Sequence, residues 1–275
     1  MFMTTSPKIR VAIAGAGGKM GREAVATLTA DDRFEVVGLL LRRPGQAGLL
    51  GAPETCRVFT DSEQLLTEIH PDIWVDFTDA ESVIAHVDAC ITYGVRPVIG
   101  ATGYTKDDLE RWQQRCRQQD LGGIAAPNFA LGALLMVRFA KEAARLFDNA
   151  EIIELHHDGK KDAPSGTARR TATAIHEARG EAAAEARIGE VSIASQVTSQ
   201  ENPARGTDVD GIRVHSVRLP GLVAHQEVIF GGAGETLTIR HDSLSRTSFM
   251  KGLVIACERV MELKGLVYGL ENLLW

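Results

Sequence analysis

The feature that most constrains the fold is the alternation, in the first half of the chain, of short apolar runs with segments of helical periodicity. Residues 9–14 form an apolar run that ends in glycines, which is typical of a fully buried strand. From Lys19 the apolar residues recur at three- and four-residue spacing, which indicates a helix. Further strands are predicted over Phe34–Leu41, Ile73–Phe77, Pro97–Gly100 and Ile124–Ala126, with a helix over Glu81–Tyr93. Strands that alternate with helices favour a parallel sheet with right-handed crossovers, so the first half predicts a doubly wound α/β domain.

The second half has a different pattern. Leu131–Phe147 is predicted to be a helix, with its apolar side formed by Leu135, Phe139, Ala143 and Leu146. A strand over Glu151–His157 and a helix over Ser165–Arg179 follow, and then an alanine- and glutamate-rich piece over Glu181–Arg187. The polar stretch Thr198–Asp210 predicts a loop.

Three strands separated by turn residues close this half, over Ile212–Leu219, Ala224–Phe230 and Thr236–His241. They predict an antiparallel meander, so the second domain is expected to be α+β with a mixed, mainly antiparallel sheet. A last helix is predicted over Ser248–Leu263. The domain boundaries are placed at residues 1–130 and 131–241.

Composition excludes several classes of protein. The 275 residues carry a net charge of −6, with a pI near 5.8, whereas a nucleic-acid-binding domain is usually basic. No segment approaches the roughly 20 apolar residues of a membrane span, and the N-terminus lacks the apolar core of a signal peptide. The four cysteines contain no Cys-x-x-Cys pair, which is typical of buried or idle thiols in a reducing compartment. We therefore expect a cytoplasmic protein with no nucleic-acid or membrane partner.

The glycine-rich loop of residues 15–21 lies between the first predicted strand and helix. Glycines there allow a tight turn and let the backbone approach a pyrophosphate at the positive end of the helix. The alternative is a glycine-rich turn that binds nothing, but strand, helix and N-terminal position all agree with a Rossmann-type dinucleotide site. An NAD-binding fold usually carries an acid at the end of the second strand, whereas this chain has Arg42 and Arg43. Two guanidinium groups suit a 2′-phosphate, which predicts NADPH, although solvated surface arginines would give the same sequence.

The segment Glu154–Thr167 concentrates acid–base chemistry. His156, His157, Lys160 and Lys161 precede a proline and a predicted helix start with Ser165 as its N-cap. A turn after the strand can bring a lysine beside a histidine, and the pair could neutralise an anionic ring and supply a proton. The first N–H groups of the helix, at Gly166 and Thr167, could bind a carboxylate. The plainer alternative is a capped surface helix with structural histidines.

With this segment the chain resembles the family of 4-hydroxy-tetrahydrodipicolinate reductases, which are also called dihydrodipicolinate reductases. The run His-His-x-x-Lys-x-Asp-Ala-Pro-Ser-Gly-Thr-Ala at 156–168 is highly specific for it, and the loop at 15–22 is similar to its cofactor loop. The similarity also covers Asp76–Thr78, Gly100–Gly103, Pro127–Phe129, Ser245–Phe249 and Gly252.

The resemblance implies NAD(P)H-dependent reduction of the dehydrated form of 4-hydroxy-tetrahydrodipicolinate in the diaminopimelate route to lysine. By motif, His156 is the proton donor or acceptor and Lys160 the second acid, with Lys161 as a competitor for the lysine role. The small dicarboxylate substrate would be bound by His157, Gly166, Thr167 and Arg246. The implied cofactor contacts, besides Arg42 and Arg43, are Gly15, Ala16, Gly17, Gly18, Lys19, Met20, Gly100, Ala101, Thr102, Ala126, Pro127, Asn128 and Phe129. No metal site is predicted.

The resemblance further implies that residues 242–275 return to the nucleotide domain and that the meander builds a homotetramer interface. Two departures from the family pattern stand out. Many relatives carry an acid where this chain has Arg42 and often accept either cofactor, so NADH is the alternative to NADPH. Ala101 replaces a threonine that is common in the loop at 100–103. Two rival functions remain at this point: a Rossmann dehydrogenase for another small acid or aldehyde, and a nucleotide-sensing protein without catalysis.

Overall fold

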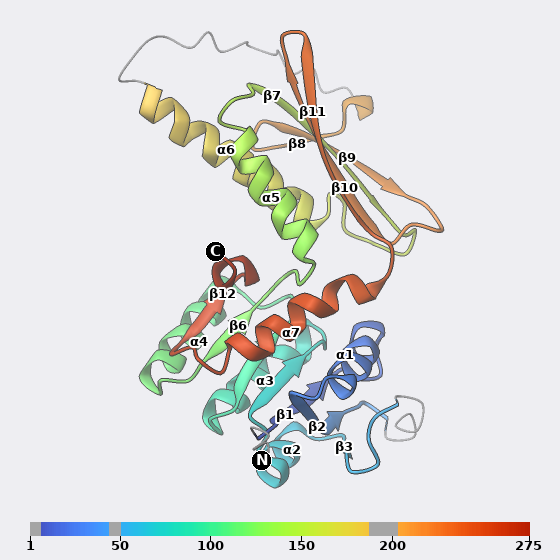
Figure 1. Ribbon diagram of the computed structural model, residues 1–275, viewed down its shortest axis with the longest axis vertical. Helices are drawn as coiled ribbons and strands as arrows, with labels where there is room; N and C mark the ends of the chain where they lie inside the picture. Colours follow the sequence, from blue (N-terminus) through green and yellow to red (C-terminus); the bar gives the residue numbers. More distant parts are fainter. Residues whose placement is uncertain (1–6, 44–50, 187–202) are drawn as a thin grey trace, which may run out of the picture. The chain divides into compact units, whose positions relative to one another are not determined.

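The computed structural model describes residues 7–43, 51–186 and 203–275, and these divide into two compact units (Figure 1). The first unit contains residues 1–130 and 246–275, and the second contains residues 131–245. Both the Rossmann-like first sheet and the mixed second sheet agree with the predicted fold class.

The first unit is built on a parallel sheet of seven strands in the order β12-β6-β5-β4-β1-β2-β3. The chain starts at β1 in the middle and winds outward in both directions, which is the doubly wound arrangement. Its strands are β1 (Ile9–Ala14), β2 (Phe34–Leu40), β3 (Arg57–Phe59), β4 (Ile73–Asp76), β5 (Arg96–Ile99), β6 (Gly123–Ala125) and β12 (Leu266–Tyr268). All four residues of β4 are buried, because helices cover both faces of a parallel sheet.

Two groups of helices flank this sheet, α1 with α7 and α2 with α3 and α4 (Figure 1). Their bounds are α1 (Lys19–Ala30), α2 (Ser62–Ile69), α3 (Ala80–Thr92), α4 (Lys106–Gln118) and α7 (Met250–Arg259), with the short turns η3 (Arg246–Phe249) and η4 (Leu270–Leu273). Side chains cap three of the helices, since Asp61, Asp79 and Thr105 each accept a backbone N–H of the first turn. Glycine at 252 lets α7 lie directly on the backbone of Phe129, where an added Cβ would be 2.0 Å from the carbonyl oxygen.

The second unit has a five-stranded sheet in the order β11-β10-β7-β9-β8. Its strands are β7 (Asn149–His156), β8 (Thr207–Val209), β9 (Ile212–Arg218), β10 (Ala224–Gly232) and β11 (Glu235–Ser243). The predicted meander is wrong in one respect: β7 lies between β9 and β10, parallel to β9 and antiparallel to β10. The prediction failed because α6 (Gly166–Ala186) carries the chain across from β7, so strands adjacent in sequence need not pair. The predicted loop at 198–210 contains β8 and η2 (Pro203–Arg205), and residues 198–202 lie outside the described ones.

Helices α5 (Leu131–Ala143) and α6 contact each other and share the hydrophobic core of the second unit (Figure 1). The predicted apolar side of α5 is wrong, because Leu135, Phe139 and Leu146 are exposed. Ala143 alone of the predicted residues is buried, and the buried side is formed by Ala133, Leu134, Met136, Ala140 and Ala143.

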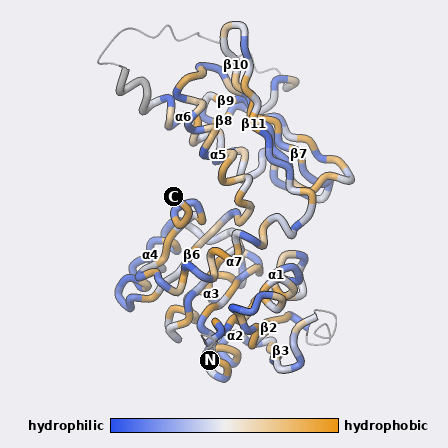
Figure 2. Tube along the Cα trace, in the orientation of Figure 1, coloured by the Kyte–Doolittle hydropathy of each residue, from blue (hydrophilic) through white to orange (hydrophobic). Residues whose placement is uncertain are grey.

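The strands of the second sheet alternate in burial. On β7, Ile152 and Glu154 are buried while Glu151, Ile153 and Leu155 are partly exposed. Figure 2 shows apolar and polar residues interspersed along these strands. One face of the sheet therefore packs on α5 and α6, and the residues of the other face are more accessible.

The four cysteines are free, as predicted, and three of them are buried. Burial raises the pKa of the Cys56 and Cys116 thiols to about 11, so neither is a reactive thiolate at neutral pH.

Candidate active site

The glycine loop forms a tight turn between β1 and α1. Gly15 has a positive φ of 74°, and a Cβ there would lie 2.6 Å from the carbonyl oxygen of Phe77. Gly18 is the N-cap of α1, and no side chain caps the helix there. Gly21 packs so closely on the loop that a Cβ would lie 2.2 Å from the carbonyl oxygen of Gly15. The sequence therefore leaves the start of α1 open to a ligand, at the point where β1 and β4 wind away from each other.

Three further motifs meet at the carboxyl ends of β4, β5 and β6. The Asp76 carbonyl oxygen accepts hydrogen bonds from the N–H groups of Gly100 at 2.8 Å and Ala101 at 3.1 Å. The rings of Phe77 and Phe129 meet edge to face, with centroids 5.9 Å apart. Gly100 is pressed against both rings, since a Cβ there would lie 2.3 Å from Phe77 Cε1 and 3.0 Å from Phe129 Cε2. Segments predicted separately from the sequence thus form one edge beside the glycine loop.

The side chains of several predicted cofactor residues are buried in the protein. Ala101 is 5% exposed and packs among residues of α3 and α4, so the methyl group that replaces the common threonine faces the core. Ala16, Ala126 and Phe129 are also buried, so none of these four side chains is exposed for contact with a cofactor. Gly17 and Met20 are half-buried, and the exposed members of the set are Gly18, Lys19, Thr102 and Pro127. The Asn128 side chain caps its own loop by accepting the Ala130 N–H at 2.8 Å.

Arg42 and Arg43 follow β2 and are both exposed. The Arg42 guanidinium pairs with the carboxylate of Asp79, the N-cap of α3. This ion pair holds Arg42 at the same edge as the loops described above, but it also sets a carboxylate against any phosphate that Arg42 would bind.

The predicted acid–base residue His156 ends β7, and its Nδ1 lies 2.5 Å from Oε2 of Glu154. Glu154, whose role the sequence interpretation missed, has a fully buried side chain. Arg218 on β9 binds both of its oxygens, at 2.9 and 2.8 Å. Burial raises the pKa of Glu154, but hydrogen bonds from His156, Arg218 and Ser216 outweigh burial and lower the pKa to about 2. Glu154 is therefore ionised at neutral pH.

The lysine loop follows directly. A turn closes it, with the Lys160 N–H donating to the His157 carbonyl oxygen at 3.1 Å, and His157 itself is half-buried. The Lys160 ammonium lies 2.6 and 2.8 Å from the two carboxylate oxygens of Asp162. Burial raises the pKa of Asp162, but the hydrogen bond and charge of Lys160 outweigh burial. The pKa is lowered overall, so the pair is ionic. Lys161 is exposed.

Helix α6 begins at Gly166 with Ser165 as its cap, as predicted: the Ser165 hydroxyl accepts the Ala168 N–H at 3.2 Å. The backbone N–H of Ser165 donates to Oε1 of Glu154 at 3.1 Å, so the carboxylate beside His156 also holds the helix start. Gly166 is exposed and Thr167 half-buried. The N-terminal end of a helix carries the positive end of its dipole, so this end is suited to a carboxylate. Arg246, the remaining predicted substrate residue, begins η3 in the first unit and is half-buried.

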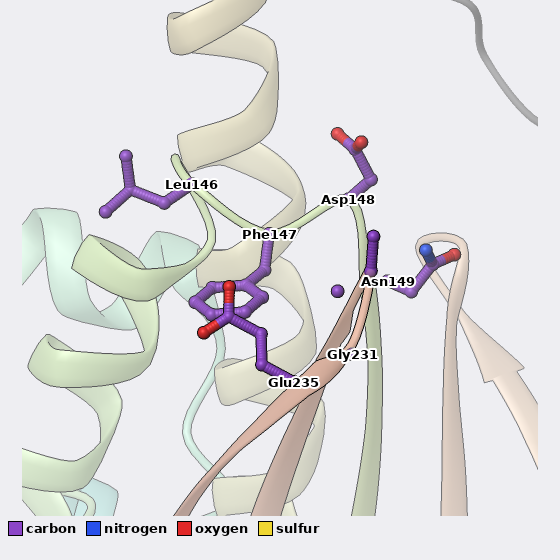
Figure 3. A pocket seen from close by; sticks show the side chains of 8 residues that line it. Leu146, Phe147, Asp148, Asn149, Gly231 and Glu235 are labelled. Carbon is purple, nitrogen blue, oxygen red and sulfur yellow. The ribbon is translucent and has the colours of Figure 1, made fainter.

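A cavity of about 570 Å³ lies elsewhere in the second unit, between the end of α5 and the turn that joins β10 to β11. Figure 3 shows the Phe147 ring beside the Glu235 side chain. Its lining residues are Leu146, Phe147, Asp148, Asn149, Gly231, Gly232, Ala233 and Glu235. They include two acids and no base, so this cavity does not suit an anionic substrate.

Family models cover nearly the whole chain. The model described as the N-terminus of dihydrodipicolinate reductase matches residues 9–129, and the model of its C-terminus matches residues 132–274. The chain belongs to the dihydrodipicolinate reductase family. The 4-hydroxy-tetrahydrodipicolinate reductase of Geobacillus kaustophilus is 48% identical over 97% of this chain and 99% of its own length. That of Streptococcus sanguinis is 48% identical over 97% and 99%.

A solved structure agrees with the family. The dipicolinate-bound dihydrodipicolinate reductase from Paenisporosarcina sp. TG-14 superposes with a TM-score of 0.82 at 44% identity, covering 97% of this chain and 99% of that one. An amine dehydrogenase from Mycobacterium smegmatis, at 16% identity and a TM-score of 0.64, shares the fold alone. In the described part of this family member, every helix is too short or too polar to cross a bilayer.

Proposed function

We propose that this chain reduces the dehydrated form of 4-hydroxy-tetrahydrodipicolinate to tetrahydrodipicolinate, in the diaminopimelate route to lysine. The observation that carries the proposal is the buried Glu154 carboxylate, which joins the His156 imidazole to the start of α6. In this proposal His156 transfers the proton, beside a helix end suited to a carboxylate. The family match over residues 9–129 and 132–274 identifies the reaction.

The loops of the first unit fit a nicotinamide dinucleotide. The glycine loop has few side chains, as needed where the backbone approaches a phosphate. A side chain at Gly15 or Gly21 would clash with neighbouring backbone atoms. The bound cofactor would supply the hydride. Its contacts would be made by the glycine loop and by residues 100–102 and 126–129. NADPH is the preferred cofactor in this proposal, because Arg42 and Arg43 provide positive charge where a 2′-phosphate would lie.

The second unit would bind the substrate and handle its proton. His156 is assigned the proton transfer and Lys160 the role of second acid, with His157 in contact with the substrate. One substrate carboxylate would lie on the Gly166 and Thr167 N–H groups, and Arg246 would be a further substrate-binding residue. For Lys160 to reach the substrate, its ammonium must either leave the Asp162 carboxylate or contact the substrate while still paired with Asp162.

Assembly into a cytoplasmic homotetramer completes the proposal. Its support is the more accessible face of the second sheet, where apolar Val217 is exposed beside the partly exposed Leu155 and Ile153. Exposed apolar residues on a sheet face are typical of a protein interface.

The test is oxidation of NADPH and NADH in the presence of the synthase that makes the substrate from pyruvate and aspartate semialdehyde. Turnover that depends on the synthase, and that is faster with NADPH, is the expected result. Binding of pyridine-2,6-dicarboxylate, a planar analogue, should raise the melting temperature further when cofactor is present. Folded protein that binds nucleotide but gives no turnover and no such shift would favour the nucleotide-sensing alternative.

A further inference from the structure

Glu154 and Arg218 form a buried ion pair next to His156, and the role inferred for it here rests on the proposed function. Arg218 approaches the carboxylate from β9, which lies parallel to β7, with His156 opposite Arg218 in the register. The pair thus lies beside His156, at the end of β7.

One carboxylate holds two parts of the site. Its Oε2 faces His156 Nδ1, and its Oε1 accepts the Ser165 N–H at the start of α6. Residues two apart on a strand share a face, which explains why Glu154 and His156 meet.

The guanidinium of Arg218 holds a third part. Besides both oxygens of Glu154, it donates to the carbonyl oxygens of Lys160 at 3.3 Å and Asp162 at 2.6 Å. These two bonds bracket the loop from which the Lys160 ammonium projects. Arg218 is 19% exposed and Glu154 is buried, so water competes little for these bonds.

An ionised carboxylate only accepts hydrogen bonds, so the His156 nitrogen that faces it must carry a proton. We propose that Glu154 and Arg218 are positioning residues: Glu154 fixes neutral His156 as the Nδ1–H tautomer, so that Nε2 is the nitrogen that takes up a proton from solvent and passes it to the substrate, and Arg218 fixes the backbone that carries Lys160. Neither side chain is assigned a contact with substrate. The imidazole, the lysine loop and the helix start then keep a single relative placement before substrate binds.

The tautomer can be read in the wild-type protein from the ¹⁵N shifts and couplings of histidine-labelled enzyme, with His156→Asn used for assignment. At a pH where His156 is neutral, we expect a protonated Nδ1 and an unprotonated Nε2. The opposite pattern in the wild type would overturn the inference, whether or not the protein turns over the proposed substrate.

Glu154→Gln supplies the kinetic test. A glutamine amide has one oxygen, so it cannot accept from His156 on one side and from the Ser165 N–H and Arg218 on the other. The Nδ1–H tautomer of His156 is then no longer favoured over the other tautomer. We expect kcat to fall by about 100-fold or more, the tautomer signal to become mixed, and the KM for NADPH to stay near its wild-type value. Unchanged kcat with an unchanged tautomer would contradict the role of Glu154. Arg218→Lys should instead lower kcat while leaving the tautomer intact, because the carboxylate remains. Wild-type kcat in that variant would refute the role of Arg218.

Glu151→Gln is the matched control. Glu151 also lies on β7 and also binds a histidine and an arginine, His215 at 2.7 Å and Arg205. It points to the opposite face of the strand, so kcat and the His156 tautomer should be unchanged. A loss equal to that of Glu154→Gln would show that the effect comes from general damage to the sheet. Synthase-dependent turnover by the wild type separates failure of this inference from failure of the proposed function.

Discussion

Nδ1 of His86 lies 2.9 Å from Oδ2 of Asp76, and the carboxylate is completely buried at the end of β4. Trp74 Nε1 and the Thr78 N–H and hydroxyl also donate to Asp76. Burial raises the pKa of Asp76, but these partners, His86 first among them, outweigh burial. The pKa is therefore lowered overall, and the carboxylate stays ionised. Because the Asp76 carbonyl oxygen also holds the backbone at Gly100, this network supports the edge assigned to the cofactor.

Replacing His86 with leucine should therefore destabilise the protein by roughly 2–4 kcal/mol, because a buried carboxylate loses a partner. Urea unfolding of wild type and variant would measure the change. His176→Leu is the control: His176 is exposed on α6, and its replacement should change the free energy of unfolding by less than about 0.5 kcal/mol. An equal loss in both variants would mean that the Asp76 contact adds nothing specific.

Gly100→Ala should weaken nucleotide binding and cost about 1–3 kcal/mol of stability, since the new methyl group would overlap the Phe77 ring. Thermal unfolding and nucleotide titration would test this. Gly180→Ala, in α6 with open space around the added methyl, should stabilise the protein by about 0.5–1 kcal/mol. If Gly100→Ala behaves like Gly180→Ala, the close packing at Gly100 is not required.

Arg42→Glu should raise the KM for NADPH by about 10-fold or more, as expected for loss of a charge-assisted contact, and leave the KM for NADH nearly unchanged. Asp79→Asn should lower the KM for NADPH, because the carboxylate that pairs with Arg42 is gone. Asparagine still caps α3, so the helix should be unaffected. Steady-state kinetics with both cofactors would measure these changes. Equal losses for the two cofactors in Arg42→Glu would contradict the 2′-phosphate assignment.

Lys160→Ala should lower kcat by about 100-fold with a smaller change in substrate KM. Lys161→Ala should retain most activity, because the Lys161 side chain is exposed and no role is assigned to it. Parallel kinetics of the two single variants decide between neighbouring lysines. Loss of kcat in the Lys161 variant alone would reverse the assignment.

Acid should remove the stabilisation that comes from Glu154. Its pKa is lowered from 4.5 to about 2, so the contribution is complete above pH 4.5 and disappears as pH falls toward 2. The full effect is on the order of 3 kcal/mol. Wild type and Glu154→Gln should therefore differ in free energy of unfolding at neutral pH, and the difference should shrink below about pH 5. A difference that is independent of pH would mean that the charge of Glu154 does not carry its contribution.

Much of the first unit could be predicted from its sequence, because each strand is a short apolar run and each glycine turn has a local cause. Helix α4 was not predicted: its buried residues Asp108, Trp112 and Cys116 recur at helical spacing, but one of them is an acid and charged residues fill most of the segment, so no apolar stripe stands out. Strands β3 and β12 are three residues long, too short to show any periodicity.

The candidate site was only partly predictable for a different reason. The histidine–lysine segment is contiguous, so its residues could be found together. The role of Glu154 depends on Arg218, which lies 64 residues away and reaches it only because β7 pairs with β9. Alternation along β7 would have placed Glu154 and His156 on one face, and this signal was available in the sequence.

The close contact between Gly252 and the Phe129 backbone has a consequence for synthesis of the protein. Strand β12 and helix α7 belong to the first unit, yet the ribosome makes them after every residue of the second. A nascent chain that has emerged only as far as Ala130 lacks both the edge strand beside β6 and the helix beneath Phe129. The segment at 127–129 therefore gains its final support only when translation has passed through the second unit.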